Sequence, residues 1–157
     1  GAWKLALRME PGTKLVQEYD AYFDKILLDA PCSSEARFVS TNPKTFGYWK
    51  ERKVKEMAYT QRELLLSAWK ALRPGGVLVY STCTYSPEEN ECQISRLLDR
   101  MPDAEVLPID TLPLASLPIL SSWCGVDIRT EVSDCLRVMP TKDIEGFFIA
   151  KVGKIMC

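Results

Sequence analysis

Two cysteines and a carboxylate follow two short apolar stretches of the chain. Asp29 and Cys32 come directly after residues 25–28 (KILL), and Cys83 comes shortly after residues 77–80 (VLVY). A thiolate can attack carbon as a nucleophile, and a carboxylate can hold or move a proton. Because the chain contains no histidine, Cys-His and Ser-His-Asp catalysis are excluded. Any cysteine chemistry must therefore take its base from another residue type.

The elements expected to position these residues are two strands and an intervening helix. Residues 25–28 and 77–80 have the continuous apolar pattern of strands in a parallel sheet that is covered on both faces. Residues 54–72 carry apolar side chains at helical spacing, and residues 73–76 (RPGG) provide a stop signal. Strand, helix and strand in this order predict a βαβ unit and an α/β fold.

A second helix is expected after the second strand. Ser86 can serve as its N-cap, Pro87 as its first residue and Glu89 as the capping-box partner, with the helix running through Asp99. The partial positive charge of this helix N-terminus would favour a thiolate at nearby Cys83.

The two thiols are expected to lie together despite their separation in sequence. The carboxyl ends of parallel strands open onto one crevice, and neighbouring strands are about 4.8 Å apart. Asp29, Cys32 and Cys83 would then share that crevice. The alternative is that Cys32 and Cys83 are simply buried small apolar side chains, which is the commonest fate of a free cysteine.

The remainder of the chain completes a single domain. Residues 101–133 contain four prolines and predict a variable connection with one short strand near Val106. Residues 135–151 predict two closing strands, at 135–139 and 146–151. With the motif-rich core at 24–99, these segments account for one unit spanning residues 1–157.

Composition restricts the class of protein. The chain has 157 residues, of which 46% are hydrophobic and 26% charged, as in ordinary globular domains. No apolar run approaches the roughly 20 residues of a membrane span, and no signal peptide is apparent, which points to the cytoplasm. The six cysteines form no C-x-x-C pair, so neither a metal site nor a disulfide framework is expected.

One segment is markedly basic although the net charge is -1. Residues 44–73 hold eight basic and three acidic side chains. This segment is either a phosphate-binding surface or the solvated face of a helix.

Several motifs together resemble the Sun-domain family of RNA cytosine carbon-5 methyltransferases, the bacterial Fmu type and its eukaryotic relatives. The motifs are DAPCS at 29–33, QRELLLSAWKALRPGGVLVYSTC at 61–83, PEENE at 87–91, RVMP at 137–140 and EGFFIAK at 145–151. The resemblance implies a Rossmann-like methyltransferase sheet that binds S-adenosylmethionine. It also implies that this chain is the C-terminal half of the domain, because the first strands and the glycine-rich cofactor loop of the family would lie upstream of DAPCS.

The resemblance also implies a role for each site residue. Cys83 matches the family's nucleophile, and Cys32 matches the second cysteine, which assists release of the product. Asp29 matches a carboxylate that reaches cofactor and base, with Ala30 and Pro31 beside it along the cofactor. A thiolate is needed because carbon 5 of cytosine becomes enamine-like only after addition at carbon 6.

The RNA substrate, either rRNA or tRNA, would meet basic side chains near the site. Arg37, Lys53 and Lys55 are the candidate phosphate contacts. Ser34 and Ala36 stand where many relatives carry a glycine, which would reshape the loop after Cys32.

Two other functions are compatible with parts of the sequence. In DNA cytosine methyltransferases the cysteine of the proline-cysteine motif is the nucleophile, but as a family they lack the second cysteine of the STC type. A non-catalytic RNA-binding or partner-docking remnant of the same fold would explain the missing cofactor loop.

Overall fold

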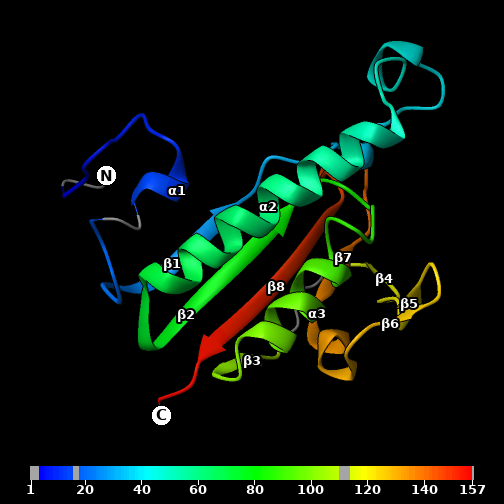
Figure 1. The fold of residues 1–157 in the computed structure, drawn as a ribbon. Helices are drawn as coiled ribbons and strands as arrows, with labels where there is room; N and C mark the ends of the chain where they lie inside the picture. Colours follow the sequence, from blue (N-terminus) through cyan, green and yellow to red (C-terminus); the bar gives the residue numbers. More distant parts are fainter. Residues whose placement is uncertain (1–3, 16–17, 110–113, 157) are drawn as a thin grey trace.

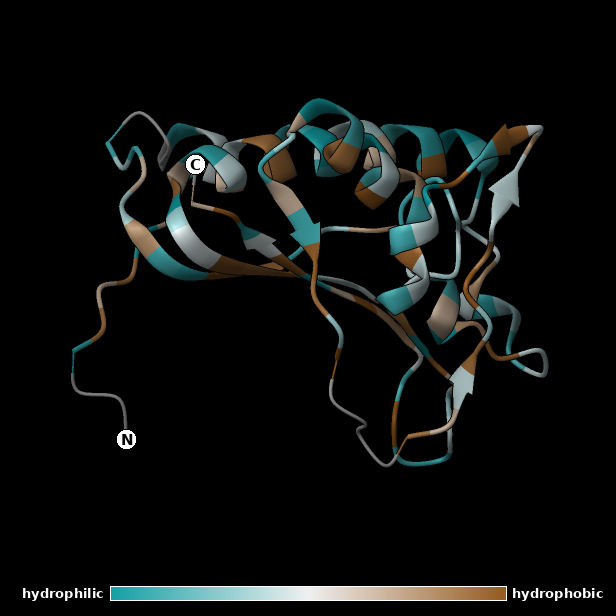
Figure 2. Ribbon diagram, turned by 90° about the horizontal axis from the view of Figure 1, so that it is seen from below, coloured by the Kyte–Doolittle hydropathy of each residue, from teal (hydrophilic) through white to brown (hydrophobic). Residues whose placement is uncertain are grey.

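The computed structural model describes residues 4–15, 18–109 and 114–156, and these form a mixed sheet with two helices on one face (Figures 1 and 2). The strand order is β1-β2-β8-β7-β4, and β3 pairs with β8 beyond this path. The strands are β1 (Phe23–Asp29), β2 (Leu72–Thr82), β3 (Ala104–Val106), β4 (Ser116–Leu117), β7 (Leu136–Val138) and β8 (Phe147–Lys154).

The predicted βαβ unit is confirmed. Strands β1 and β2 are parallel neighbours, with Asp29 opposite Ser81, and helix α2 (Glu51–Ala71) connects them. The helix ends one residue earlier than predicted, and β2 begins at Leu72 rather than at Val77. The turn that the glycines provide therefore lies at the start of β2, where Gly75 has a φ of 76° that suits glycine.

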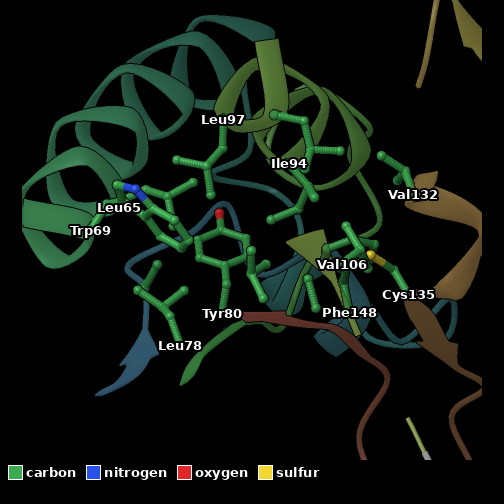
Figure 3. Packing of buried hydrophobic residues seen from close by; sticks show 14 of the residues in the cluster. Leu65, Trp69, Leu78, Tyr80, Ile94, Leu97, Val106, Val132, Cys135 and Phe148 are labelled. Atoms are coloured by element: carbon green, nitrogen blue, oxygen red, sulfur yellow. The ribbon is translucent and has the colours of Figure 1, made fainter. Parts of the chain in front are cut away.

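Helices α2 and α3 (Glu91–Arg100) cover the same face of the sheet (Figure 2). Beneath them lies one apolar cluster, in which Leu65 and Trp69 from α2 and Ile94 and Leu97 from α3 pack on Tyr80 of β2 (Figure 3). This packing fixes the sheet edge from which the cysteine-bearing loops leave.

The prediction that both strands are covered on both faces was wrong for the described residues. Along β2 the even-numbered residues from Leu78 to Thr82 are buried and the odd-numbered ones only partly so. On β1, which is an edge strand of this sheet, Leu27 is 72% exposed. The reason is that α2 and α3 lie over the same face of the sheet, and that β1 pairs with β2 along one of its two edges.

The predicted start of the second helix was also wrong. Helix α3 begins at Glu91 with Asn90 as its N-cap, and residues 87–90 form a turn in which the Glu89 amide donates to the Ser86 carbonyl. The Ser86 hydroxyl donates to Glu88, so Glu89 is not a capping-box partner. The helix N-terminus therefore lies farther along the chain from Cys83 than the sequence analysis assumed.

The connection from 101 to 133 contains more structure than predicted. Besides β3 at Val106 and strand β4, it includes a hairpin of β5 (Ser122–Trp123) and β6 (Val126–Asp127). A 3-10 helix, η3 (Thr130–Asp134), follows, and the two closing strands are β7 and β8, as predicted. Pro113 and Cys157 lie outside the described residues.

Short helical segments occupy the remaining loops. Helix α1 (Gly12–Leu15) precedes β1, and two 3-10 turns, η1 (Glu35–Arg37) and η2 (Pro43–Thr45), lie between β1 and α2.

Candidate active site

The structure brings Cys32 and Cys83 into contact at the carboxyl ends of β1 and β2. Their sulfur atoms are 3.2 Å apart, although 51 positions separate them in sequence. Both thiols are free and only partly buried, in contrast to Cys135, which lies in the apolar core. A paired, accessible position of this kind distinguishes these two cysteines from ordinary core residues.

The environment of Cys32 disfavours its ionisation. Burial, followed by the hydrogen bond with Cys83, raises the pKa of Cys32 from 9.0 to about 11. At neutral pH Cys32 therefore keeps its proton. Its S–H group can therefore donate to the sulfur of Cys83.

Ser34 lies against both sulfur atoms. Its hydroxyl oxygen is 3.6 Å from the sulfur of Cys83 and 3.9 Å from that of Cys32. The residue adopts a left-handed backbone conformation, with φ 61° and ψ 31°. Such a conformation favours glycine, which agrees with the expectation that many relatives have glycine here.

The DAP segment runs along the end of β1 beside β2. The exposed carboxylate of Asp29 accepts a hydrogen bond of 3.1 Å from the Ser81 hydroxyl, two residues before Cys83. The Ala30 amide donates to the Ser81 carbonyl, and the Pro31 carbonyl accepts from the side chain of Gln61. One face of the Asp29 carboxylate is thus anchored at the same strand edge as the thiols.

Arg37 lies close to the thiol pair, in turn η1. Coulombic interaction with Cys83 is the main cause that raises the pKa of Arg37, and Glu145 adds to it through an ion pair of 3.0 Å. The loop of Arg37 is joined directly to that of Cys83, because the Ala36 amide donates a hydrogen bond of 3.2 Å to the Cys83 carbonyl.

Lys53 and Lys55 lie at the start of α2, and the charge of Lys55 interacts with that of Glu88, in the loop after Cys83. Both belong to the first turns of α2 and are exposed to solvent. The Lys55 ammonium forms an ion pair of 2.8 Å with Glu51, one turn earlier. The structure thus places these lysines on a solvated helical face at the amino end of α2.

Several residues at the site escaped the sequence analysis. Gln61, Glu89 and Asn90 are fully buried and bond to residues on either side of the two cysteines. The sequence contained an indication for Gln61, because this polar residue interrupts a buried apolar stripe on α2. The stripe consists of Val54, Ala58, Leu65 and Trp69. A glutamine in an apolar stripe indicates a buried polar contact.

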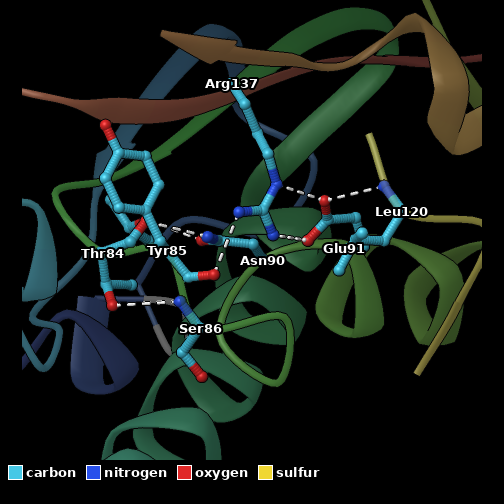
Figure 4. A network of polar contacts seen from close by, with 8 residues as sticks. Thr84, Tyr85, Ser86, Asn90, Glu91, Leu120 and Arg137 are labelled. Atoms are coloured by element: carbon cyan, nitrogen blue, oxygen red, sulfur yellow. Dashed lines mark hydrogen bonds and ion pairs between the residues drawn. The ribbon is translucent and has the colours of Figure 1, made fainter. Parts of the chain in front are cut away.

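A buried ion pair supports the segment that follows Cys83 (Figure 4). Arg137 of β7 donates two hydrogen bonds of 2.6 Å to the carboxylate of Glu91, at the start of α3. Arg137 also donates to the carbonyl of Tyr85, whose hydroxyl donates to the carbonyl of Val138. The site loop is therefore tied to both the sheet and α3.

Within residues 4–15, 18–109 and 114–156, no group of three or more His, Cys, Asp or Glu side chains is arranged to hold a metal ion. No helix in this described part is long and apolar enough to cross a membrane.

The fold of the described residues resembles that of solved methyltransferases. A methyltransferase homolog protein from Pyrococcus horikoshii superposes with a TM-score of 0.72 and 34% identity, covering 94% of this chain and 43% of that one. NSun6 from Pyrococcus horikoshii, solved with SFG, superposes with a TM-score of 0.66 and 35% identity, covering 96% of this chain and 34% of that one. The fold is thus that of the α/β methyltransferases.

The chain belongs to the 16S rRNA methyltransferase RsmB/F family, whose model matches residues 8–153. It is 42% identical to the ribosomal RNA small subunit methyltransferase F of Erwinia tasmaniensis, over 85% of this chain and 26% of that protein. It is also 42% identical to the tRNA (cytosine(49)-C(5))-methyltransferase of Pyrococcus abyssi, over 87% of this chain and 43% of that protein. The chain thus spans less than half the length of these relatives.

Proposed function

We propose that this chain is the C-terminal part of a catalytic domain that methylates carbon 5 of a cytosine in rRNA or tRNA, in the cytoplasm, with S-adenosylmethionine as the methyl donor. The observation that carries the proposal is the contact of 3.2 Å between Cys32 and Cys83. Two relatives that are 42% identical to the chain are an rRNA methyltransferase and a tRNA cytosine-C5 methyltransferase. In this proposal, residues 1–157 form one partial domain.

Cys83 begins the reaction as the nucleophile. Its thiolate forms a bond to carbon 6 of cytosine, and the electron pair of the double bond between carbons 5 and 6 moves toward carbon 5. S-adenosylmethionine, when bound, would supply the methyl group to carbon 5, with cleavage of its methyl–sulfur bond and release of S-adenosylhomocysteine. The target base must leave its stack to reach the thiol, which favours single-stranded or opened RNA.

Cys32 acts in the second half of the reaction. The proton on carbon 5 must be removed so that the bond between carbon 6 and Cys83 can break and the ring double bond can return. Part of the raised pKa of Cys32 comes from its contact with the Cys83 thiol. Burial is the main cause of this raised pKa, and once Cys83 is an uncharged thioether the coulombic part of its contribution is absent.

Asp29, Ala30 and Pro31 fit one wall of a site for S-adenosylmethionine. The Asp29 side chain is exposed at the carboxyl end of β1, where ligands of α/β sheets bind, and Ser81 donates to only one of its oxygens. The other oxygen remains available to accept from the cofactor or to hydrogen-bond the cytosine ring. Arg37, Lys53 and Lys55 are the proposed phosphate contacts for RNA.

The two thiols can be assigned by the behaviour of their variants in the complete enzyme with cofactor and labelled RNA. Cys83→Ala should form neither a covalent protein–RNA complex nor 5-methylcytosine. Cys32→Ala should accumulate a denaturation-resistant complex, because addition and methylation proceed while elimination is slowed. A denaturing gel reads both, with Cys135→Ala as the control for a cysteine outside the site. A complex that builds up in Cys83→Ala and is absent in Cys32→Ala would reverse the roles and favour the DNA-enzyme type of mechanism.

A second candidate is a non-catalytic RNA-binding or partner-docking remnant of the same fold. Isothermal titration of the 157-residue chain with S-adenosylmethionine is expected to show no useful affinity, because the chain supplies one wall of the site. The complete protein should bind the cofactor, and failure of the complete protein to bind would favour the remnant.

A further inference from the structure

We infer that the consecutive residues Glu89 and Asn90 are positioning residues that hold the two thiols in contact. Glu89, together with Gln61, holds both neighbours of Cys32, and Asn90 holds both neighbours of Cys83. A role of Glu89 and Asn90 in catalysis rests on the proposed function, whereas their effect on the distance between the two thiols does not.

On the Cys32 side, the contacts bracket the cysteine. Ser33 comes directly after Cys32, and its amide donates a hydrogen bond of 3.0 Å to Oε2 of Glu89. Pro31 comes directly before Cys32, and its carbonyl accepts a hydrogen bond of 2.8 Å from Nε2 of Gln61. The same Nε2 also donates to Oε2 of Glu89, at 2.8 Å. The peptide groups on both sides of Cys32 are thus held by one buried pair of side chains.

On the Cys83 side, a single amide brackets the cysteine. The Thr82 hydroxyl donates a hydrogen bond of 2.6 Å to Oδ1 of Asn90. Nδ2 of Asn90 donates to the Thr84 carbonyl at 2.9 Å. Thr82, Thr84 and Asn90 are all fully buried.

The two halves of this arrangement are linked to each other and to the core. The hydroxyls of Ser33 and Thr84 are 2.8 Å apart, which joins the loop of Cys32 directly to that of Cys83. The Glu89 carbonyl accepts a bond of 2.6 Å from the hydroxyl of Tyr80, in the centre of the core. Because Glu89 and Asn90 share one peptide bond, displacement of either should shift one cysteine relative to the other.

The burial of these groups makes the arrangement stiff. A buried polar group that loses its partner cannot recover the bond from water, so alternative loop conformations are disfavoured. Burial also raises the pKa of Glu89, and a neutral amide at this position can still accept both bonds. Glu89→Gln is therefore the conservative variant, whereas Glu89→Ala removes the acceptor.

The spacing of the thiols can be measured without methylation. Oxidised glutathione takes two electrons from Cys32 and Cys83, giving one disulfide, two molecules of reduced glutathione and no net change in protons. The equilibrium constant reports the effective concentration of one thiol at the other. It is read from the mass of the cross-linked peptides in the complete protein, so the other cysteines do not interfere.

We expect Glu89→Ala and Asn90→Ala to lower this effective concentration by about ten- to a hundredfold, since a displacement near 1 Å has effects of that size. Thr82→Val, which removes one hydroxyl at constant shape, should lower it severalfold, and Glu89→Gln should change it less than twofold. Gln93→Ala is the matched control, because Gln93 is an equally buried amide with two hydrogen bonds, to the Ala58 and Glu88 carbonyls. It should destabilise the fold yet leave the thiol equilibrium near that of the parent.

An unchanged equilibrium in Thr82→Val and in folded Glu89→Ala would overturn the inference, as would an equal loss in Gln93→Ala. If an alanine variant fails to fold, Thr82→Val and Glu89→Gln decide the matter. In the methylation assay a positioning role predicts a lower kcat with little change in KM, and recovery in Glu89→Gln. Loss of the proposed function would instead show as absence of an adduct in the parent enzyme, with the thiol equilibria unaffected.

Discussion

Arg137 and Glu91 form a two-pronged ion pair inside the protein, with both hydrogen bonds at 2.6 Å and side chains only 7% and 0% exposed. It joins β7 to the first turn of α3, and Glu91 also accepts a hydrogen bond from the Leu120 amide (Figure 4). The pair therefore connects three segments that are distant in sequence.

Removing one partner of this pair should be costly. Arg137→Met leaves a buried carboxylate without its cation and should lower the free energy of unfolding by about 3–5 kcal/mol. Combining it with Glu91→Gln should lose less than the sum of the two single changes, because the second change removes the uncompensated charge. Urea unfolding measures both effects, and strictly additive losses would contradict the coupling.

The ionisation of Cys32 should depend on Cys83. Alkylation of Cys32 by iodoacetamide, followed by peptide mass as a function of pH, should have its midpoint at about 11 in the parent protein. In Cys83→Ala the midpoint should fall, since the hydrogen bond and charge of Cys83 contribute to raising the pKa, but burial should keep it above the ordinary value. A midpoint that does not move would show that Cys83 contributes nothing.

The same shift carries a stability effect with a defined sign. The folded protein holds the Cys32 proton more tightly than the unfolded chain, so this contribution to stability is complete below pH 9.0 and is lost as the pH rises to about 11. Cys32→Ala should therefore show a shallower loss of stability than the parent over that range.

Ser34 offers a test of backbone strain beside the thiols. Ser34→Gly should stabilise the fold by up to about 1 kcal/mol, because glycine enters the left-handed region without steric penalty. Ser34→Ala, which removes the same hydroxyl but keeps the strain, should not stabilise. Thermal unfolding of the two variants separates the backbone effect from the loss of the hydroxyl, and an equal change in both would refute the strain argument.

The basic face of α2 can be tested by the salt dependence of RNA binding in the complete protein. Replacing Lys53 and Lys55 by alanine should weaken binding and reduce the slope of log affinity against log salt by roughly one unit for each lost phosphate contact. Lys70→Ala is the control, since Lys70 is exposed roughly 22 Å farther along the same helix from Lys55. If Lys70→Ala weakens RNA binding equally, or if the salt slope does not change in the Lys53 and Lys55 variants, the start of α2 is a solvated helical face.

Much of the fold was predictable from local patterns in the sequence. The βαβ unit, the position of Val106 in a short strand and the two closing strands follow from the alternation of apolar runs, helical spacing and turn residues, all of which act over a few residues. Membership of the methyltransferase family was indicated by motifs such as DAPCS and STC, because residue types at strand ends determine which chemistry a sheet edge can support.

The tertiary structure alone decided which side chains meet. Glu89 has the spacing of a capping-box residue, yet its carboxylate turns inward to Ser33 and Gln61, because residues 87–90 form a turn and α3 starts at Glu91. The loop after β1 meets that of Cys83 through the Ala36 amide, which donates to the Cys83 carbonyl, and only the folded chain brings these two loops together. Contacts such as these depend on the packing of segments distant in the chain, and no local pattern records that packing.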